Sequence, residues 1–139
     1  MPVIQFFQEK IRFKLPHPRK TSQWILNVLK SEDHKPAGIN FIFCSDQYLR
    51  TINLEYLAHD TFTDIITFDY SDASDIQGDV FISIERVREN AEKFRTSLDE
   101  EVHRVMVHGV LHLMGYSDKS KSAKALMRKK EDAYLSLRR

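Results

Sequence analysis

The hydrophobic pattern of the chain changes its period near Glu85, and this change limits the possible folds more than any other feature. Before it, runs rich in β-branched and aromatic residues indicate strands at residues 3–7, 39–44, 63–70 and 78–84. Helical spacing of apolar residues lies between these runs at residues 21–29 and 46–57. After it, the apolar residues keep a helical period. The pattern predicts an α+β fold in which a small mixed sheet of about four strands packs against about five helices.

Helix signals in the second half predict one long helix that ends at a glycine. Ser97 with Glu100 three residues later forms a capping box, and Gly115 is a natural C-terminal stop. In the preceding helix, the residues expected to face inward are Val87, Ala91 and Phe94. In the last helix, at residues 122–137, the residues at helical spacing are Ala125, Leu126, Lys129, Ala133 and Leu137.

The composition predicts one folded domain covering residues 1–139. The 139 residues contain no repeat and no long Pro/Gly/Ser linker, and 42% of them are hydrophobic, which argues against a disordered or fibrous chain. The net charge is +1, so a polyanion would have to bind a local basic patch. One such patch is residues 119–139, with eight basic and two acidic residues. This segment is either a solvated helix face or a surface that contacts phosphates.

Cysteine usage and hydropathy indicate the compartment. The single cysteine, Cys44, cannot form an internal disulfide, and the first ten residues lack the basic and apolar regions of a signal peptide. No apolar run approaches the roughly 18 residues that a membrane span needs. We therefore expect a cytoplasmic protein with no membrane partner.

The segment VHGVLHLMGYSD at residues 107–118 contains a candidate metal site. His108 and His112 are four residues apart, so on a helix both imidazoles can reach one ion. Gly115 can reverse the chain and bring Asp118 back toward them. Two histidines and a carboxylate would form a three-ligand zinc site with a fourth position for water. Alternatively, one histidine packs in the core and the other faces solvent, which is common for such pairs.

The ligand spacing is that of metzincin proteases with Asp as the last ligand. The residue after His108 is Gly109, however, where a zincin carries the Glu that acts as general base. A glycine in a helix costs about 1 kcal/mol relative to alanine, so we expect another element or the substrate to approach the backbone closely there.

Three ordered motifs resemble one family. HGVLHLMGYSD, at residues 108–118, is similar to the HGxLHLxGYDH signature of the YbeY family. NLEYLAHDTFTDIITF, at residues 53–68, and GDVFIS, at residues 78–83, resemble two further stretches of that family. The resemblance implies a small single-domain bacterial endoribonuclease that depends on a metal and acts in ribosomal RNA maturation.

The sequence departs from the family pattern at three positions. Asp118 stands where the family usually has its third histidine ligand, and Ser117 stands where it usually has Asp. Leu57 follows Tyr56, where the family commonly has an Arg that binds phosphate. The basic residues that are candidates to replace this Arg are His59, Lys10, Arg12 and Lys14.

The resemblance implies hydrolysis of single-stranded RNA, at the 3′ end of 16S ribosomal RNA, and a role in ribosome assembly or quality control. The expected ligands of a single Zn²⁺, or of another divalent metal such as Fe(II), are His108, His112 and Asp118. Water at the ion is the expected nucleophile, and no side chain is assigned as general base. The expected partners are ribosomal RNA and the ribosome or its small subunit, and no DNA.

Two other functions stay open. The metal could hold the helix to the following turn in a non-catalytic ribosome-assembly factor whose basic tail binds RNA, or the chain could be a metallopeptidase.

Asp64 and Asp79 are candidates to orient a ligand histidine, or they satisfy local backbone groups. His103 is expected to face solvent. The aromatic residues expected in the core are Trp24, Phe41, Phe43, Tyr48, Phe68 and Phe81.

Overall fold

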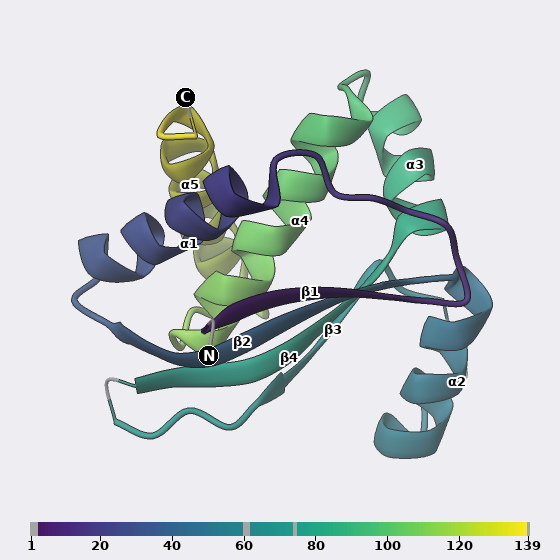
Figure 1. Ribbon diagram of the computed structural model, residues 1–139, viewed down its shortest axis with the longest axis horizontal. Coiled ribbons are helices and arrows are strands. Elements are labelled where there is room, and N and C mark those ends of the chain that lie inside the picture. The colour runs from purple at the N-terminus through teal and green to yellow at the C-terminus, as the bar shows by residue number, and fades with distance from the viewer. Residues whose placement is uncertain (1–2, 60–61, 74, 139) are drawn as a thin grey trace.

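The computed structural model describes residues 3–59, 62–73 and 75–138, and these form an α+β fold with a mixed sheet, as predicted (Figure 1). The motif at residues 53–68 thus includes two residues, 60 and 61, that lie outside the described ranges. The elements in chain order are β1 (Ile4–Glu9), α1 (Pro18–Ser31), β2 (Lys35–Cys44), α2 (Asp46–Leu57), β3 (Ile65–Asp69), β4 (Asp75–Ser83), α3 (Ile84–Lys93), α4 (Leu98–Leu113) and α5 (Lys121–Ser136).

The sheet has the strand order β1-β2-β4-β3. β1 and β4 both pair parallel to β2, and β3 pairs antiparallel to β4. The parallel pairs require crossover connections, which α1 and the segment containing α2 and β3 supply. Strand β4 begins earlier than its apolar run indicates, because Asp75 and Ile76 extend the pairing with Lys35 and Pro36 of β2. The start of β4 is determined by backbone hydrogen bonds, which cannot be inferred from the pattern of apolar side chains.

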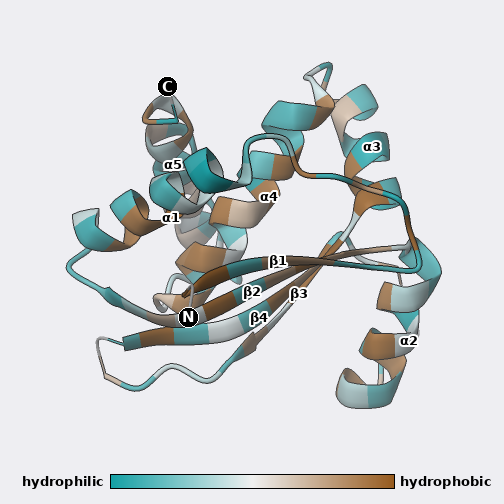
Figure 2. Cartoon of the chain, in the orientation of Figure 1, coloured by the Kyte–Doolittle hydropathy of each residue, from teal (hydrophilic) through white to brown (hydrophobic). Residues whose placement is uncertain are grey.

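Apolar side chains alternate between the two faces of the sheet. Ile39, Phe41 and Phe43 of β2 point into the main core, which the residues of α1 and α4 complete. On the opposite face, a smaller cluster of Cys44, Leu49 and Ile66 lies beneath α2. Figures 1 and 2 show α1, α3, α4 and α5 on one side of the sheet and α2 on the other. Of the aromatic residues expected in the core, Trp24, Phe41 and Phe43 are fully buried, and the others pack around the smaller cluster.

Helix α4 is the central helix of the main core. Ser97 caps it by accepting a hydrogen bond from the amide of Glu100, as the capping signal predicts. The Glu100 carboxylate does not return the bond to Ser97 but accepts one from the Thr96 hydroxyl at 2.5 Å. Gly109 lies against the sheet, where a Cβ would stand 2.8 Å from Val80 Cγ1 and 3.0 Å from Ile65 Cδ1. The expectation that another element approaches Gly109 closely is confirmed.

Replacing Gly109 with alanine is expected to lower the free energy of unfolding by about 1–2 kcal/mol. The gain of about 1 kcal/mol in helix propensity is smaller than the cost of overpacking, because the new methyl group must displace side chains of β3 and β4. Chemical denaturation measures the difference. Gly38→Ala is the control, since a Cβ there meets nothing within 4 Å and should leave the stability unchanged or higher. A Gly109→Ala protein as stable as the wild type would contradict the packing.

Two expectations about exposure are wrong. Phe94, expected to face inward, is the C-cap of α3 and is 57% exposed. In α5 the buried residues are Met127, Glu131 and Tyr134, whereas Leu126 and Leu137 are about half exposed. The buried stripe of α5 thus includes a charged residue and differs from the set that the sequence places at helical spacing.

His103, expected to face solvent, is the second exception, with only 5% of its surface exposed. Its ring packs against Trp24 with 5.4 Å between centroids, and its Nδ1 lies 2.7 Å from the carbonyl oxygen of Asp99. Burial disfavours the charged imidazole and lowers the pKa of His103 below its ordinary value of 6.5.

The buried His103 is expected to make folding stability depend on pH. As pH falls below about 6.5, the unfolded chain takes up a proton that the folded ring does not, so the free energy of unfolding decreases. For this one group, the free energy of unfolding falls by at most about 1.4 kcal/mol per pH unit. The fall ends once the pH reaches the pKa of His103 in the folded protein. Denaturation at pH 8 and at pH 5 should show a larger loss for the wild type than for His103→Gln. Equal losses for the two proteins would mean that the ring titrates normally.

Candidate metal centre

The C-terminal end of α4 is a tight reversal around Gly115. The amide of Gly115 donates to the His112 carbonyl at 3.0 Å, and the amide of Tyr116 donates to the Leu111 carbonyl at 3.0 Å. This pair of bonds is the Schellman motif, which needs a left-handed residue after the helix, and Gly115 supplies it with φ of 99°. The chain then turns back along the helix end, so that Asp118 faces the residues one and two turns before the stop.

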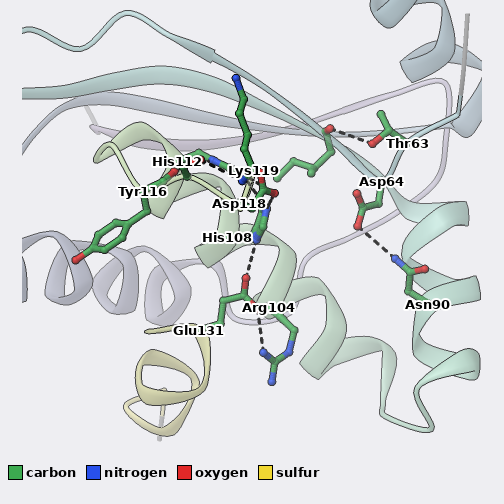
Figure 3. A network of polar contacts seen from close by, with 12 residues as sticks. Thr63, Asp64, Asn90, Arg104, His108, His112, Tyr116, Asp118, Lys119 and Glu131 are labelled. Atoms are coloured by element: carbon green, nitrogen blue, oxygen red, sulfur yellow. Dashed lines mark hydrogen bonds and ion pairs between the residues drawn. The ribbon is translucent and has the colours of Figure 1, made fainter. Parts of the chain in front are cut away.

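The turn brings the three predicted ligand residues together (Figure 3). The Nε2 atoms of His108 and His112 are 2.9 Å apart, and Asp118 Oδ2 lies 3.4 Å from each of them. All three side chains are partly buried, with 21%, 25% and 42% of their surfaces exposed. Among the described residues, these form the one group of three possible ligand atoms that all lie within 4.8 Å of one another.

Both histidines are held by their other ring nitrogen. His108 Nδ1 lies 2.6 Å from Glu131 Oε2, and His112 Nδ1 lies 3.0 Å from the carbonyl oxygen of Tyr116. Because a carboxylate and a carbonyl can only accept, each Nδ1 carries the hydrogen, and both Nε2 atoms point toward the same space beside Asp118, where they can serve as metal ligands. Two lone pairs and a carboxylate at this separation repel one another unless a cation or protons lie between them. The donor set therefore fits a divalent metal, and its nitrogen and oxygen atoms suit zinc or iron.

Glu131 is the residue of this site that the sequence analysis missed. It lies on the buried face of α5, 5% exposed, and contacts both His108 and the guanidinium of Arg104, whose NH1 is 3.0 Å from Oε1. Burial alone would lower the pKa of His108, but the hydrogen bond and charge of Glu131 outweigh it and raise that pKa. A useful signal was present: Met127, Glu131 and Tyr134 are spaced as one helical stripe, which places a carboxylate among buried residues.

A second carboxylate anchors the turn after α4. Glu32, just past the end of α1, accepts hydrogen bonds from the hydroxyls of Tyr116 and Tyr134 and from Lys130 Nζ. Burial tends to raise the pKa of Glu32, but these donors together lower it. Since the carbonyl of Tyr116 is the acceptor for His112, this cluster fixes a residue that orients a candidate ligand (Figure 3 labels Tyr116 and His112).

The two aspartates considered as orienting groups have other partners. Asp79 accepts a hydrogen bond from Asn40 Nδ2 at 3.0 Å, and Asp64 accepts one from Asn90 Nδ2 at 3.3 Å. The orienting positions next to the imidazoles are taken by Glu131 and by the Tyr116 carbonyl. Sequence spacing did not indicate either partner, because one lies on another helix and the other is a backbone group.

Comparison with known proteins identifies the family. The family model described as "Endoribonuclease YbeY" matches residues 3–138. The chain belongs to the YbeY family. Among curated YbeY relatives, the protein of Amoebophilus asiaticus, named Endoribonuclease YbeY, is 48% identical over 95% of this chain and 90% of its own length. The Endoribonuclease YbeY of Flavobacterium psychrophilum is 50% identical over 94% of each chain.

The fold also matches a solved structure. A Thermotoga maritima protein, determined in solution, superposes with a TM-score of 0.69 at 27% identity over 97% of this chain and 88% of that one. The family assignment that the three motifs suggested is thus confirmed. Within the described part of the chain, no helix has both the length and the apolar character needed to cross a bilayer.

The substitutes considered for the family's Arg do not lie at this site. The pocket beside His108 and Asp118 is lined by other basic residues, Arg104 of α4 and Lys124 and Arg128 of α5. His59 and the three basic residues between β1 and α1 are absent from its lining. Lys124 and Arg128 are both exposed at the pocket, so their charged groups can contact a phosphate of a bound nucleic acid.

Proposed function

We propose that this protein is an endoribonuclease that hydrolyses phosphodiester bonds in single-stranded RNA and acts in the maturation of ribosomal RNA. The observation that carries the proposal is the convergence of His108, His112 and Asp118 at 2.9–3.4 Å in a member of this family. These residues would hold one divalent ion, with zinc as the first candidate. When bound, the ion would polarise a phosphoryl oxygen as a Lewis acid and lower the pKa of water enough for hydroxide, the nucleophile, to form near neutral pH.

The chain's own residues supply binding and orientation. Glu131 and the Tyr116 carbonyl keep the two imidazoles in the tautomer that directs Nε2 at the site. The exposed cations Lys124 and Arg128 line the adjoining pocket and would bind the phosphates that flank the cleaved bond. Other basic residues of the segment that contains α5 would add contacts with ribosomal RNA, in a small ribosomal subunit or its precursor.

A cleavage assay with metal removal tests the proposal. The protein, incubated with labelled single-stranded RNA, is expected to produce internal cuts that stop on treatment with a chelator and return on addition of Zn²⁺. Double-stranded RNA of the same sequence should be cut far more slowly. Cleavage that persists in protein shown by metal analysis to hold no ion would contradict the metal-dependent mechanism, and a well-folded, metal-loaded protein that cuts no RNA would contradict the nuclease function.

The structure argues against the peptidase alternative. Gly109, the position at which a zincin carries its general base, is buried against β3 and β4. A side chain at that position would enter the core. A peptide substrate included in the same assay should therefore remain intact.

A further inference from the structure

A pocket of about 610 Å³ adjoins the candidate metal centre. This volume is larger than the space that one metal ion would occupy. Three helices line it, with Asn90 of α3 and its C-cap Phe94, Glu101 and His108 of α4, and Arg128 of α5. Its size lies in the range of sites that bind small molecules. Glu101, Val105 and His108 follow one another at helical spacing along the same face of α4, so the pocket continues directly from the candidate ligand His108.

Glu101 is a buried carboxylate with no assigned role in the proposed hydrolysis. Its surface is 5% exposed, it lines the pocket, and none of the described residues forms a hydrogen bond or ion pair with its side chain. The nearest cation on its own helix, Arg104, is already paired with Glu131 at 3.0 Å and with Asp132 at 2.7 Å. Burial raises the pKa of Glu101. The charges of Asp64 and Glu131 raise this pKa further, whereas the charge of Arg104 lowers it. Among the described residues, the one fully buried polar side-chain atom without a partner is His34 Nδ1, so the Glu101 oxygens open onto the pocket. A ligand that brings N–H groups into the pocket can therefore donate hydrogen bonds to this carboxylate.

Neither a second metal ion nor a phosphate suits the position of Glu101. Among the described residues, no group of three ligand atoms that includes Glu101 lies close enough to hold an ion. A phosphate is disfavoured beside Glu101 itself, because Asp64 and Glu131 add negative charge there, whereas Lys124 and Arg128 of the same pocket stay available to phosphates. A neutral, planar group with N–H donors meets neither objection. Phe94, 57% exposed at the pocket, offers an aromatic face on which such a group can stack.

We propose that this pocket binds a guanine base of the RNA, with the Glu101 carboxylate accepting hydrogen bonds from the N1–H and the 2-amino group. Guanine is the RNA base that presents two adjacent donors to one carboxylate on its Watson–Crick edge, whereas adenine and cytosine present one amino group and uracil one imino group. Phe94 stacks on the base, as aromatic side chains do on unstacked RNA bases, and Arg128 and Lys124 contact its phosphates. The inference rests on the proposed nuclease function in one respect: the base next to the cleaved phosphate would then determine where the enzyme cuts.

Binding of nucleotides tests the pocket without any cleavage. 5′-GMP, 5′-IMP and 5′-AMP are titrated into the metal-loaded protein by calorimetry and by NMR of backbone amides in α3 and α4. IMP lacks only the 2-amino group, so it separates one hydrogen bond from two. GMP is expected to bind roughly 10-fold or more tightly than AMP, with IMP between them. Equal affinities for the three nucleotides would overturn the proposal.

A matched pair of variants assigns the preference to Glu101. Glu101→Gln replaces one acceptor with a donor and should reduce GMP affinity to that of AMP, while the loss of a buried charge leaves thermal stability unchanged or higher. Glu100→Gln, the same change at the exposed neighbouring position outside this pocket, should keep the preference. A Glu101→Gln protein that still prefers GMP would overturn the assignment.

Cleavage of designed oligonucleotides separates this inference from the proposed function. Single-stranded RNAs with one guanosine, and the same RNAs with inosine or adenosine in its place, are expected to be cut beside that position with rates that fall by about 10-fold or more from guanosine to adenosine. Equal cutting of all three RNAs would refute the guanine pocket and leave the nuclease function intact. A GMP preference that Glu101→Gln removes, in a protein that cuts no RNA, would support the pocket and refute the nuclease function.

Discussion

Replacing His112 with alanine is expected to lower kcat/KM for RNA cleavage by about 1000-fold or more. The variant leaves His108 and Asp118 as two ligands, which is one fewer than catalytic zinc sites have in proteins. The Lewis-acid contribution of an ion is several kcal/mol, and each 1.36 kcal/mol corresponds to a tenfold change in rate. Zinc analysis should show the content fall from about one ion per chain to a small fraction of that value.

The change at His112 should not unfold the protein, since the imidazole is 25% exposed at the end of α4. His17→Asn is the control, because it also removes a histidine and asparagine tolerates the left-handed conformation of residue 17, where φ is 49°. The control is expected to keep full metal content and full activity. A His112→Ala protein that retains both would show that the convergence of the three side chains has no role in metal binding.

This outcome also separates the nuclease from a non-catalytic assembly factor. In the latter, the ion only attaches the turn to α4, so loss of His112 would reduce stability and RNA binding together. In the nuclease, RNA affinity is retained through the basic residues of α5 while cleavage is lost. Measuring RNA binding and cleavage on the same variant therefore distinguishes the two functions.

The candidate site could be predicted from the sequence because its parts are close along the chain. His108, His112 and Asp118 lie within one helix end and one turn, and local rules for helix spacing and glycine stops determine how such a segment folds. The sheet was predictable for a similar reason, since its strands are runs rich in apolar residues that helices or, between β3 and β4, a short polar loop separate. The first and last residues of the strands could not be predicted in this way. Asp75, for example, belongs to β4 because its backbone pairs with Lys35.

The surroundings of the site depend on packing between elements distant in sequence. Glu131 reaches His108 from α5, 23 residues along the chain, and Glu32 reaches Tyr116 across 84 residues. His103 is buried because α1 brings Trp24 against it. A charged or polar residue in a helical stripe gives a single-sequence analysis no sign of which neighbour it will meet, so these residues were assigned to solvent or to no role.

Replacing Glu131 with glutamine is expected to lower metal affinity by about 10- to 100-fold while the three ligands stay in place. Outer hydrogen bonds of this kind orient a ligand histidine and raise its basicity, and their loss has effects of this size. In the wild type the carboxylate accepts the Nδ1–H of His108 at 2.6 Å, whereas the amide of glutamine accepts it without a negative charge. Competition with a chromophoric chelator measures the affinity, and NMR of the imidazole nitrogens reports which ring nitrogen of His108 holds the proton.

Asp132→Asn separates orientation of His108 from the ion pairs of Arg104. Glu131 and Asp132 both pair with this guanidinium, at 3.0 and 2.7 Å, but Glu131 alone of the two contacts the imidazole. Both variants should therefore destabilise the contact between α4 and α5, by about 2 kcal/mol for the buried Glu131 and less for Asp132, which is 58% exposed. If Glu131 orients His108, metal affinity and the proton position change in Glu131→Gln and not in Asp132→Asn. If the two variants lose metal affinity equally, the effect comes from the attachment of α5, and Glu131 has no special role at the ligand.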